Sequence, residues 1–133
     1  MDSILGEART GPVCLRRTDI AKLVTEAIRY GSEHMGLYER HAWVVMPNHV
    51  HLLITPLVDP SKITHSIKRF TAREANKILG GAGGSFWQDE SYDHLVRDTG
   101  EFRRIIAYIH ANPVRAGLAA DAERYPWSSA TAD

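Results

Sequence analysis

Two histidines two positions apart, His49 and His51, are the residues of this sequence whose types and spacing most readily suggest chemistry. They stand in an apolar, β-branched run that follows Pro47 and Asn48, which are turn-forming residues, so residues 43–55 are expected to form a β-hairpin. Side chains alternate between the two faces of a strand, so both imidazoles should lie on one face, with Cα atoms about 6 to 7 Å apart. They could bind one metal ion together, or each could be satisfied separately by hydrogen bonds.

Tyr108 and Asn112 form a second pair, four residues apart in a segment whose apolar residues recur at helical spacing. We expect a helix from about residue 100 to residue 111 or 112. It should end before Pro113, because proline lacks a backbone donor and disfavours helical geometry at the preceding residue. Residues four apart share one face of a helix, so the phenol and the amide should lie together.

These four side chains would make a complete set for phosphoryl transfer, although each also has a more ordinary explanation. A helical tyrosine is commonly a packing residue, and asparagine is common at helix ends. Together, two imidazoles and an amide oxygen can hold Mg²⁺ or Mn²⁺, which polarises a phosphodiester oxygen. A phenol, with an unperturbed pKa of about 10, can then attack phosphorus and form a covalent phosphotyrosine.

A cluster of basic residues lies in segment 61–79, which is predicted to be a helix because its apolar residues line one side. The basic residues lie mostly on the other side, and the candidates for DNA contact among them are Lys62, Lys68, Arg69 and Arg73. Such a face is usually a solvated charged surface. Spaced over several turns, it can also follow a phosphate backbone and add affinity without base specificity.

The composition indicates one ordinary domain. At 133 residues the chain can bury enough surface to fold as a single unit. Cys14 is the only cysteine, which excludes an intramolecular disulfide and a Cys-rich zinc site, so the cytoplasm is the default location. No apolar run approaches the length of a membrane span, so no membrane partner is expected. Sixteen basic residues balance sixteen acidic ones, so any nucleic-acid site would be a local patch.

The remaining segments are predicted as a helix at 18–31, strands at 36–45 and 92–97, a flexible linker at 80–84, and a tail at 115–131 that lies back on the domain. The first 17 residues are harder to assign, because Gly6, Gly11 and Pro12 interrupt any long element. Within them, residues 13–15 are a candidate short strand.

Several motifs in this order resemble the IS200-like transposases, and within them the REP-associated tyrosine transposases of the HUH endonuclease class. The first is Met-Pro-Asn-His-Val-His-Leu-Leu at 46–53, and the last runs from Tyr108 through Ala-Asn-Pro-Val-Arg-Ala-Gly-Leu at 111–118. Between them lie Phe-Trp-Gln at 86–88, Tyr-Asp-His at 92–94, and Arg97. The resemblance therefore extends from about residue 43 to residue 118.

This resemblance implies a ferredoxin-like α+β domain with a central antiparallel β-sheet and helices packed on it. It implies single-stranded DNA with hairpin ends as substrate and Mg²⁺ or Mn²⁺ as cofactor. His49 and His51 would be metal ligands, Asn112 the third ligand and Tyr108 the nucleophile. The reaction would leave a 5′-phosphotyrosine and a free 3′-hydroxyl, and Arg97 joins the basic residues of 61–79 as a candidate for DNA contact.

Two features of the sequence depart from this pattern or compete with it. Members of the family usually open with a long central strand of the type aromatic-x-Val-Thr-x-Arg, of which residues 1–17 show a weak version. Either residues 5–15 supply a degraded strand or the chain has lost its start. Tyr92 is a second candidate nucleophile, ranked below Tyr108 because the resemblance places the nucleophile on the helix.

Two other functions stay open from the sequence. A domesticated DNA-binding module that keeps the fold and the hairpin recognition without useful catalysis would suit the neutral net charge. An unrelated metal hydrolase could use the histidine pair with water as the nucleophile. The resemblance also leaves two oligomeric states, since related transposases act as dimers joined through sheet edges while others are monomers, so a homodimer is one expectation.

Overall fold

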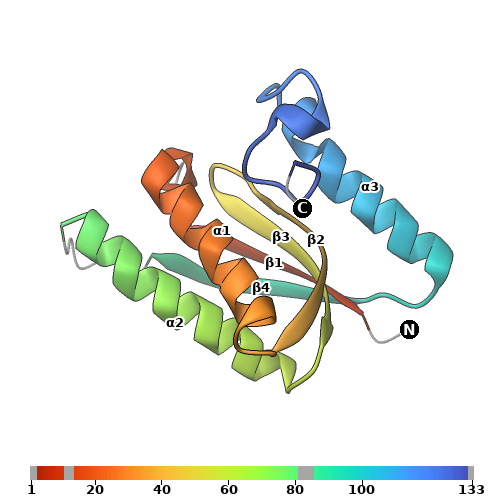
Figure 1. Cartoon of the computed structure of the whole chain (residues 1–133), viewed down its shortest axis with the longest axis horizontal. Coiled ribbons are helices and arrows are strands. Elements are labelled where there is room, and N and C mark those ends of the chain that lie inside the picture. The colour runs from red at the N-terminus through yellow and green to blue at the C-terminus, as the bar shows by residue number, and fades with distance from the viewer. Residues whose placement is uncertain (1–2, 11–13, 81–85, 132–133) are drawn as a thin grey trace.

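The computed structural model describes residues 3–10, 14–80 and 86–131, with the backbone alone for residues 89–92. Four strands and three long helices make up most of this part of the chain (Figure 1). In chain order they are β1 (Ile4–Thr10), α1 (Thr18–Glu33), β2 (Tyr38–Val45), β3 (His49–Pro56), α2 (Pro60–Ile78), β4 (Trp87–Leu95) and α3 (Thr99–Arg115). Short 3₁₀ turns lie at Cys14–Arg16 and Ala122–Arg124.

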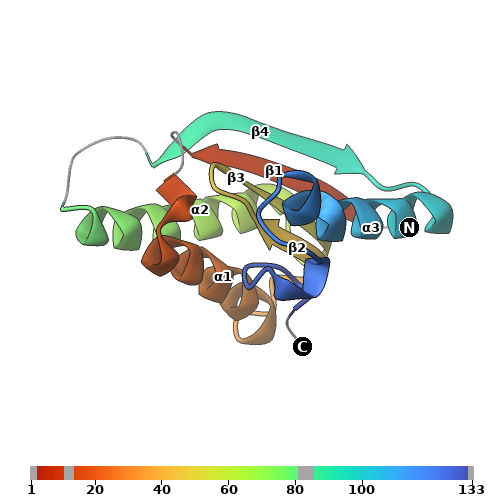
Figure 2. The ribbon, with the colours of Figure 1, turned by 90° about the horizontal axis from the view of Figure 1, so that it is seen from above.

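The four strands form one sheet in the order β2-β3-β1-β4, and every neighbouring pair is antiparallel. Figure 2 shows β2 and β4 at the two edges of the sheet, with β3 and β1 between them. This is the ferredoxin-like arrangement of two split β-α-β units, with α3 added after the last strand. The expected α+β class with a central antiparallel sheet is confirmed.

The helices cover both faces of the sheet. Helices α1 and α2 lie side by side on one face (Figure 1), where buried α1 residues pack with Trp43, Val45 and Val50. Helix α3 packs on the other face, where Ile109 is buried in a cluster with Val44 and Leu53. Because strand residues alternate between faces, β3 sends Val50 to α1 and Leu53 to α3. His49 and His51 share the α3 face with Leu53, as the alternation predicts.

The hairpin forms where the sequence predicts it, the three helices begin within about one residue of their predicted starts, and side chains cap the starts of α2 and α3. The side chain of Asp59 accepts a hydrogen bond from the Ser61 backbone N–H at the start of α2. The side chain of Asp98 accepts one from the Glu101 backbone N–H, at 2.7 Å, at the start of α3. Each cap satisfies a backbone donor that the first helical turn leaves without a partner.

The predicted end of the last helix is wrong. Helix α3 continues through Pro113 and ends at Arg115, and the chain reverses at Gly117, whose φ of 75° allows the turn that closes the helix. The Leu118 N–H donates to the Pro113 carbonyl oxygen at 2.8 Å, as expected for a glycine-terminated helix. Proline has no backbone N–H, so the last turn of the helix lacks one hydrogen bond. The ring of Pro113 is fully buried, and this packing offsets the loss.

Of the two alternatives for the N-terminal segment, a degraded strand within residues 5–15 agrees with the structure: a strand is present as Ile4–Thr10, in the interior of the sheet between β3 and β4. Two other strand predictions need correction. Residues 14 and 15 of the candidate strand at 13–15 lie in the 3₁₀ turn Cys14–Arg16, and residue 13 lies outside the described residues. Strand β4 begins at Trp87, five residues before the predicted start at 92, because it pairs along the whole of β1. Residues 81–84 of the predicted linker also lie outside the described part.

The C-terminal segment packs against β2, as expected for the tail. The Val45 N–H donates to the Trp127 carbonyl oxygen and the Ser129 N–H to the Trp43 carbonyl oxygen, so this segment pairs with the β2 edge. The buried Tyr125 hydroxyl donates to the Val45 carbonyl oxygen. Within the described residues, no helix is long and apolar enough to cross a membrane.

Candidate active site

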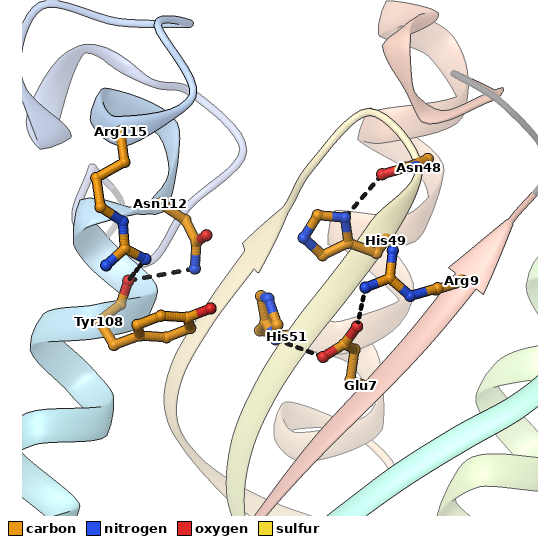
Figure 3. Close-up of polar contacts among 8 residues, drawn as sticks. All are labelled: Glu7, Arg9, Asn48, His49, His51, Tyr108, Asn112 and Arg115. Carbon is orange, nitrogen blue, oxygen red and sulfur yellow. Dashed lines mark hydrogen bonds and ion pairs between the residues drawn. The ribbon is translucent and has the colours of Figure 1, made fainter.

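The structure brings three of the predicted residues together between β3 and α3. His49 and His51 lie on the α3 face of β3 with ring centroids 4.9 Å apart and rings nearly perpendicular. Tyr108, from the middle of α3, places its ring edge-on to His51, with the centroids 5.7 Å apart. Figure 3 shows the Tyr108 hydroxyl pointing toward His51 across the space between helix and strand. Two imidazoles and a phenol from separate elements therefore face one another.

One nitrogen of each imidazole already faces a partner. The His49 Nδ1 atom lies 2.7 Å from the Asn48 Oδ1 atom, a hydrogen-bond distance. The His51 Nδ1 atom lies 3.6 Å from a carboxylate oxygen of Glu7, on the neighbouring strand β1. Among the described residues, no hydrogen bond reaches either Nε2 atom. A hydrogen on each Nδ1 would leave the Nε2 lone pairs available on the side that faces α3.

Both histidines are held in the neutral form by their surroundings. His51 is only 4% exposed, and this burial lowers its pKa to about 4. His49 is half-buried, and burial together with the positive charge of Arg9 lowers its pKa as well. A neutral imidazole has the lone pair that a metal ion requires, so the site needs no proton release to bind one at neutral pH.

Asn112 and Arg115 surround Tyr108 on the same side of α3. The Asn112 amide nitrogen donates to the Tyr108 carbonyl oxygen at 3.2 Å, which leaves its Oδ1 atom as a free acceptor for a ligand. The Arg115 guanidinium lies over the Tyr108 ring, 4.3 Å from its centroid. The Tyr108 side chain is 45% exposed, so a large substrate can reach its hydroxyl. Figure 3 shows the Tyr108 ring and the Asn112 amide on the side of α3 toward the strand that carries the histidines.

The donors at this place suit a divalent metal with open coordination positions. Two imidazole nitrogens and one amide oxygen are ligands that Mn²⁺ accepts, and a substrate phosphate and water can complete the coordination of Mn²⁺ or Mg²⁺. In the part of the chain that the structure describes, no three His, Cys, Asp or Glu side chains form a closed metal-binding group. Any ion held here would therefore depend on Asn112 and on the substrate for its remaining ligands.

Comparison with known proteins places these residues in a family. The sequence pattern of the family described as Transposase IS200 like matches residues 14–112, about three quarters of the chain. The chain belongs to the IS200-like transposase family. The match includes the histidine pair, Tyr108 and Asn112.

Individual relatives agree with this assignment. The REP-associated tyrosine transposase of Escherichia coli (strain K12) is 30% identical over 96 residues, which are 69% of this chain and 54% of the relative. A second relative, from Haemophilus influenzae, is 29% identical over 123 residues, which are 84% of this chain and 69% of the relative. The chain thus spans only about half the length of the E. coli relative.

A solved structure of similar fold is that of the REP-associated tyrosine transposase bound to a REP hairpin. It superposes with a TM-score of 0.74 at 24% sequence identity, covering 96% of this chain and 76% of that one. The likeness supports the fold of this IS200-like transposase over nearly the whole chain.

The structure separates the predicted DNA-contact residues of this transposase from Tyr108. The four basic residues of the predicted helix lie on α2, which covers the opposite face of the sheet from α3; they are Lys62, Lys68, Arg69 and Arg73. Arg97 lies on the α3 side, exposed just before that helix begins. A DNA strand that contacted both groups would have to pass around an edge of the sheet.

Tyr92, the second candidate nucleophile, lies on β4 opposite Glu7, and its side chain is outside the described part.

Sequence reasoning missed three residues of this site. Asn48 and Arg115 both stand inside the motifs that carry the family resemblance. Asn48 precedes His49 in the chain, and Arg115 follows Asn112 by about one helical turn, so the sequence could have placed both of them near the site. Glu7 lies in a segment that the sequence leaves unassigned, and only the pairing of β1 with β3 brings it opposite His51. No signal along the chain links these two positions.

Proposed function

We propose that this protein is a metal-dependent enzyme that nicks and rejoins single-stranded DNA at hairpin-forming ends, through a 5′-phosphotyrosine on Tyr108. The observation that carries the proposal is the position of the Tyr108 ring, exposed on α3 and edge-on to the buried His51 of β3. A tyrosine that only packed α3 onto the sheet would be buried, as Ile109 beside it is.

In the first step, the Tyr108 oxygen attacks a DNA phosphorus atom and releases its own proton. A new bond joins the tyrosine oxygen to the 5′-phosphate, the bond from phosphorus to the 3′-oxygen breaks, and the leaving 3′-oxygen takes up a proton. Tyrosine suits this role because its hydroxyl ionises far more readily than that of serine. The Arg115 guanidinium over the ring favours the negative charge that develops on the tyrosine oxygen as its proton leaves.

His49, His51 and Asn112 would hold the divalent metal, through the two Nε2 atoms and the amide Oδ1 atom. When bound, Mg²⁺ or Mn²⁺ supplies Lewis-acid stabilisation of the charge that develops on the phosphoryl oxygens. The contribution of the protein is to keep the two imidazoles neutral and fixed in orientation. Burial of His51 and the contacts of both Nδ1 atoms serve that purpose.

In the second step, a 3′-hydroxyl attacks the phosphotyrosine and regenerates the phenol. One phosphodiester bond is exchanged for a phosphotyrosine and then restored, so the joining reaction needs no nucleotide hydrolysis. The phenol is an adequate leaving group for the same reason that it is an adequate nucleophile. Joining to a different 3′ end recombines the DNA.

Single-stranded DNA with a hairpin is the partner that we assign to this site. Support comes from the solved relative, which is described as bound to a REP hairpin. Arg97 and Arg115 lie on the α3 side, and Lys62, Lys68, Arg69 and Arg73 on α2 would hold DNA that passes around the sheet. Such contacts would add salt-dependent affinity without reading the base sequence.

The test is to mix the purified protein with a labelled single-stranded hairpin oligonucleotide and Mn²⁺, and to look for a covalent adduct on a denaturing gel. The wild type should form an adduct that disappears in Tyr108→Phe. Tyr30→Phe, which changes another exposed tyrosine on α1, is the matched control and should retain the adduct.

Two other outcomes would contradict the proposal. Binding of the hairpin with no adduct in any variant would favour the DNA-binding module, which keeps the fold without catalysis. Cleavage that persists in Tyr108→Phe would favour a hydrolase that uses water, or a nucleophile at Tyr92. The double variant Tyr92→Phe, Tyr108→Phe separates those last two cases.

A further inference from the structure

A carboxylate lies beside the histidine pair, on strand β1, which precedes the family match at residues 14–112. Glu7 of β1 is paired in register with His51 of β3, and Arg9 with His49. The Glu7 Oε2 atom is 3.6 Å from the His51 Nδ1 atom, and Figure 3 shows the carboxylate on the side of His51 away from Tyr108. The other oxygen, Oε1, is 2.7 Å from an Arg9 nitrogen.

The His51 Nδ1 atom needs such a partner. It is a buried polar atom that makes no hydrogen bond within the described residues, and buried polar atoms are normally satisfied. The acceptor in position is Glu7, whose Oε2 atom must approach by less than an ångström to reach a hydrogen-bond distance of about 2.8 Å. Since Arg9 binds Oε1, the free oxygen stays directed at the histidine.

We propose that Glu7 is a positioning residue for His51: it accepts the hydrogen of Nδ1 and so keeps the Nε2 lone pair directed toward the site. The proton of a free histidine side chain lies mostly on Nε2, where it would block a metal ion. A carboxylate beside Nδ1 reverses this preference, and its negative charge makes Nε2 a stronger ligand. The Oδ1 atom of Asn48 occupies the corresponding position beside the Nδ1 atom of His49, but it carries no charge.

The part of this inference that concerns the metal rests on the proposed function, and the part that concerns the tautomer does not. A simpler view is that Glu7 only forms a surface ion pair with Arg9. That view predicts no change at His51 when the carboxylate is removed. The two explanations therefore differ in a property of the metal-free protein.

The first experiment measures the tautomer of His51 by ¹⁵N NMR of the imidazole nitrogens in the metal-free protein at neutral pH. The wild type should carry its proton on Nδ1. Glu7→Leu, which keeps the bulk and removes the acceptor, should shift the proton toward Nε2. Glu7→Gln, which keeps an acceptor oxygen, should retain the Nδ1 form and also shows whether the position tolerates substitution. Glu39→Gln, an exposed carboxylate on β2, is the control for loss of charge.

The second experiment measures the affinity of the same proteins for Mn²⁺ alone by calorimetry. Glu7→Leu should bind about 10- to 100-fold more weakly than the wild type, with Glu7→Gln between them. An unchanged tautomer and unchanged affinity in Glu7→Leu would overturn the inference. A tautomer that shifts while the wild type binds no Mn²⁺ would uphold the role of Glu7 on His51 and refute the metal in the proposed function.

Discussion

The Tyr108 ring stands edge-on to the His51 ring, with centroids 5.7 Å apart and planes at 76°. The two residues are far apart in the sequence, and they come from a helix and a strand that pack face to face. His51 is buried and Tyr108 is exposed, so the pair joins an imidazole fixed in the sheet to a phenol at the surface.

Removal of His49 should abolish stabilisation of the protein by metal. A ligand at 100 times its dissociation constant stabilises the folded state by about 2.7 kcal/mol. The wild type should therefore melt at a higher temperature with Mn²⁺, and His49→Ala should show no such increase. His65→Ala, on the exposed side of α2, should respond as the wild type does. An equal increase in His49→Ala would exclude His49 as a ligand.

Replacement of Arg115 by glutamine should slow formation of the covalent adduct. The guanidinium lies 4.3 Å from the centroid of the Tyr108 ring, and an exposed cation–π contact is worth about 0.5 to 1 kcal/mol. Stabilisation of that size, gained in the transition state alone, corresponds to about a 2- to 5-fold change in rate. Arg115→Lys keeps the positive charge but loses the planar stacking, so its rate of adduct formation should lie between those of the wild type and Arg115→Gln. Single-turnover rates measure the effect, with Arg124→Gln as control. Equal rates in all four proteins would show that Arg115 does not assist Tyr108.

Loss of the Tyr125 hydroxyl should destabilise the protein. This buried hydroxyl donates to the Val45 carbonyl oxygen, and burial raises the pKa of Tyr125 to about 12. Tyr125→Phe leaves that carbonyl without its partner and should lower the free energy of unfolding by about 1 to 3 kcal/mol. Tyr30→Phe, at a position 56% exposed, should change it by about 0.5 kcal/mol or less. Urea unfolding compares the two, and equal stabilities would contradict the role of this bond.

Acid should destabilise the protein partly through His41. Burial lowers the pKa of His41, although the negative charge of Glu39 opposes the shift. The unfolded chain therefore takes up a proton below about pH 6.5 more readily than the folded one, and stability falls as the pH decreases. In His41→Gln the free energy of unfolding should depend less steeply on pH between 6.5 and 5. Urea midpoints across that range test this, and an unchanged slope would show that His41 does not contribute.

The sequence by itself determined the local part of this site. Alternation along a strand places His49 and His51 on one face, and the four-residue spacing places Tyr108 and Asn112 on one side of a helix. These are properties of a few adjacent residues, and the structure confirms the hairpin and the helix that carry them. The predicted end of this helix before Pro113 was wrong because the local pattern does not contain what decides it. The proline ring is buried by tertiary contacts, and the chain turns only at Gly117.

Only the tertiary structure decided which other residues join the site. The pairing of β1 between β3 and β4 brings Glu7 opposite His51, and the packing of α2 on the opposite face moves its basic residues away from Tyr108. Strand register and the choice of sheet face depend on the burial of apolar surface summed over the whole chain. No short motif encodes that sum, so a residue such as Glu7 becomes part of the site only when the sheet forms.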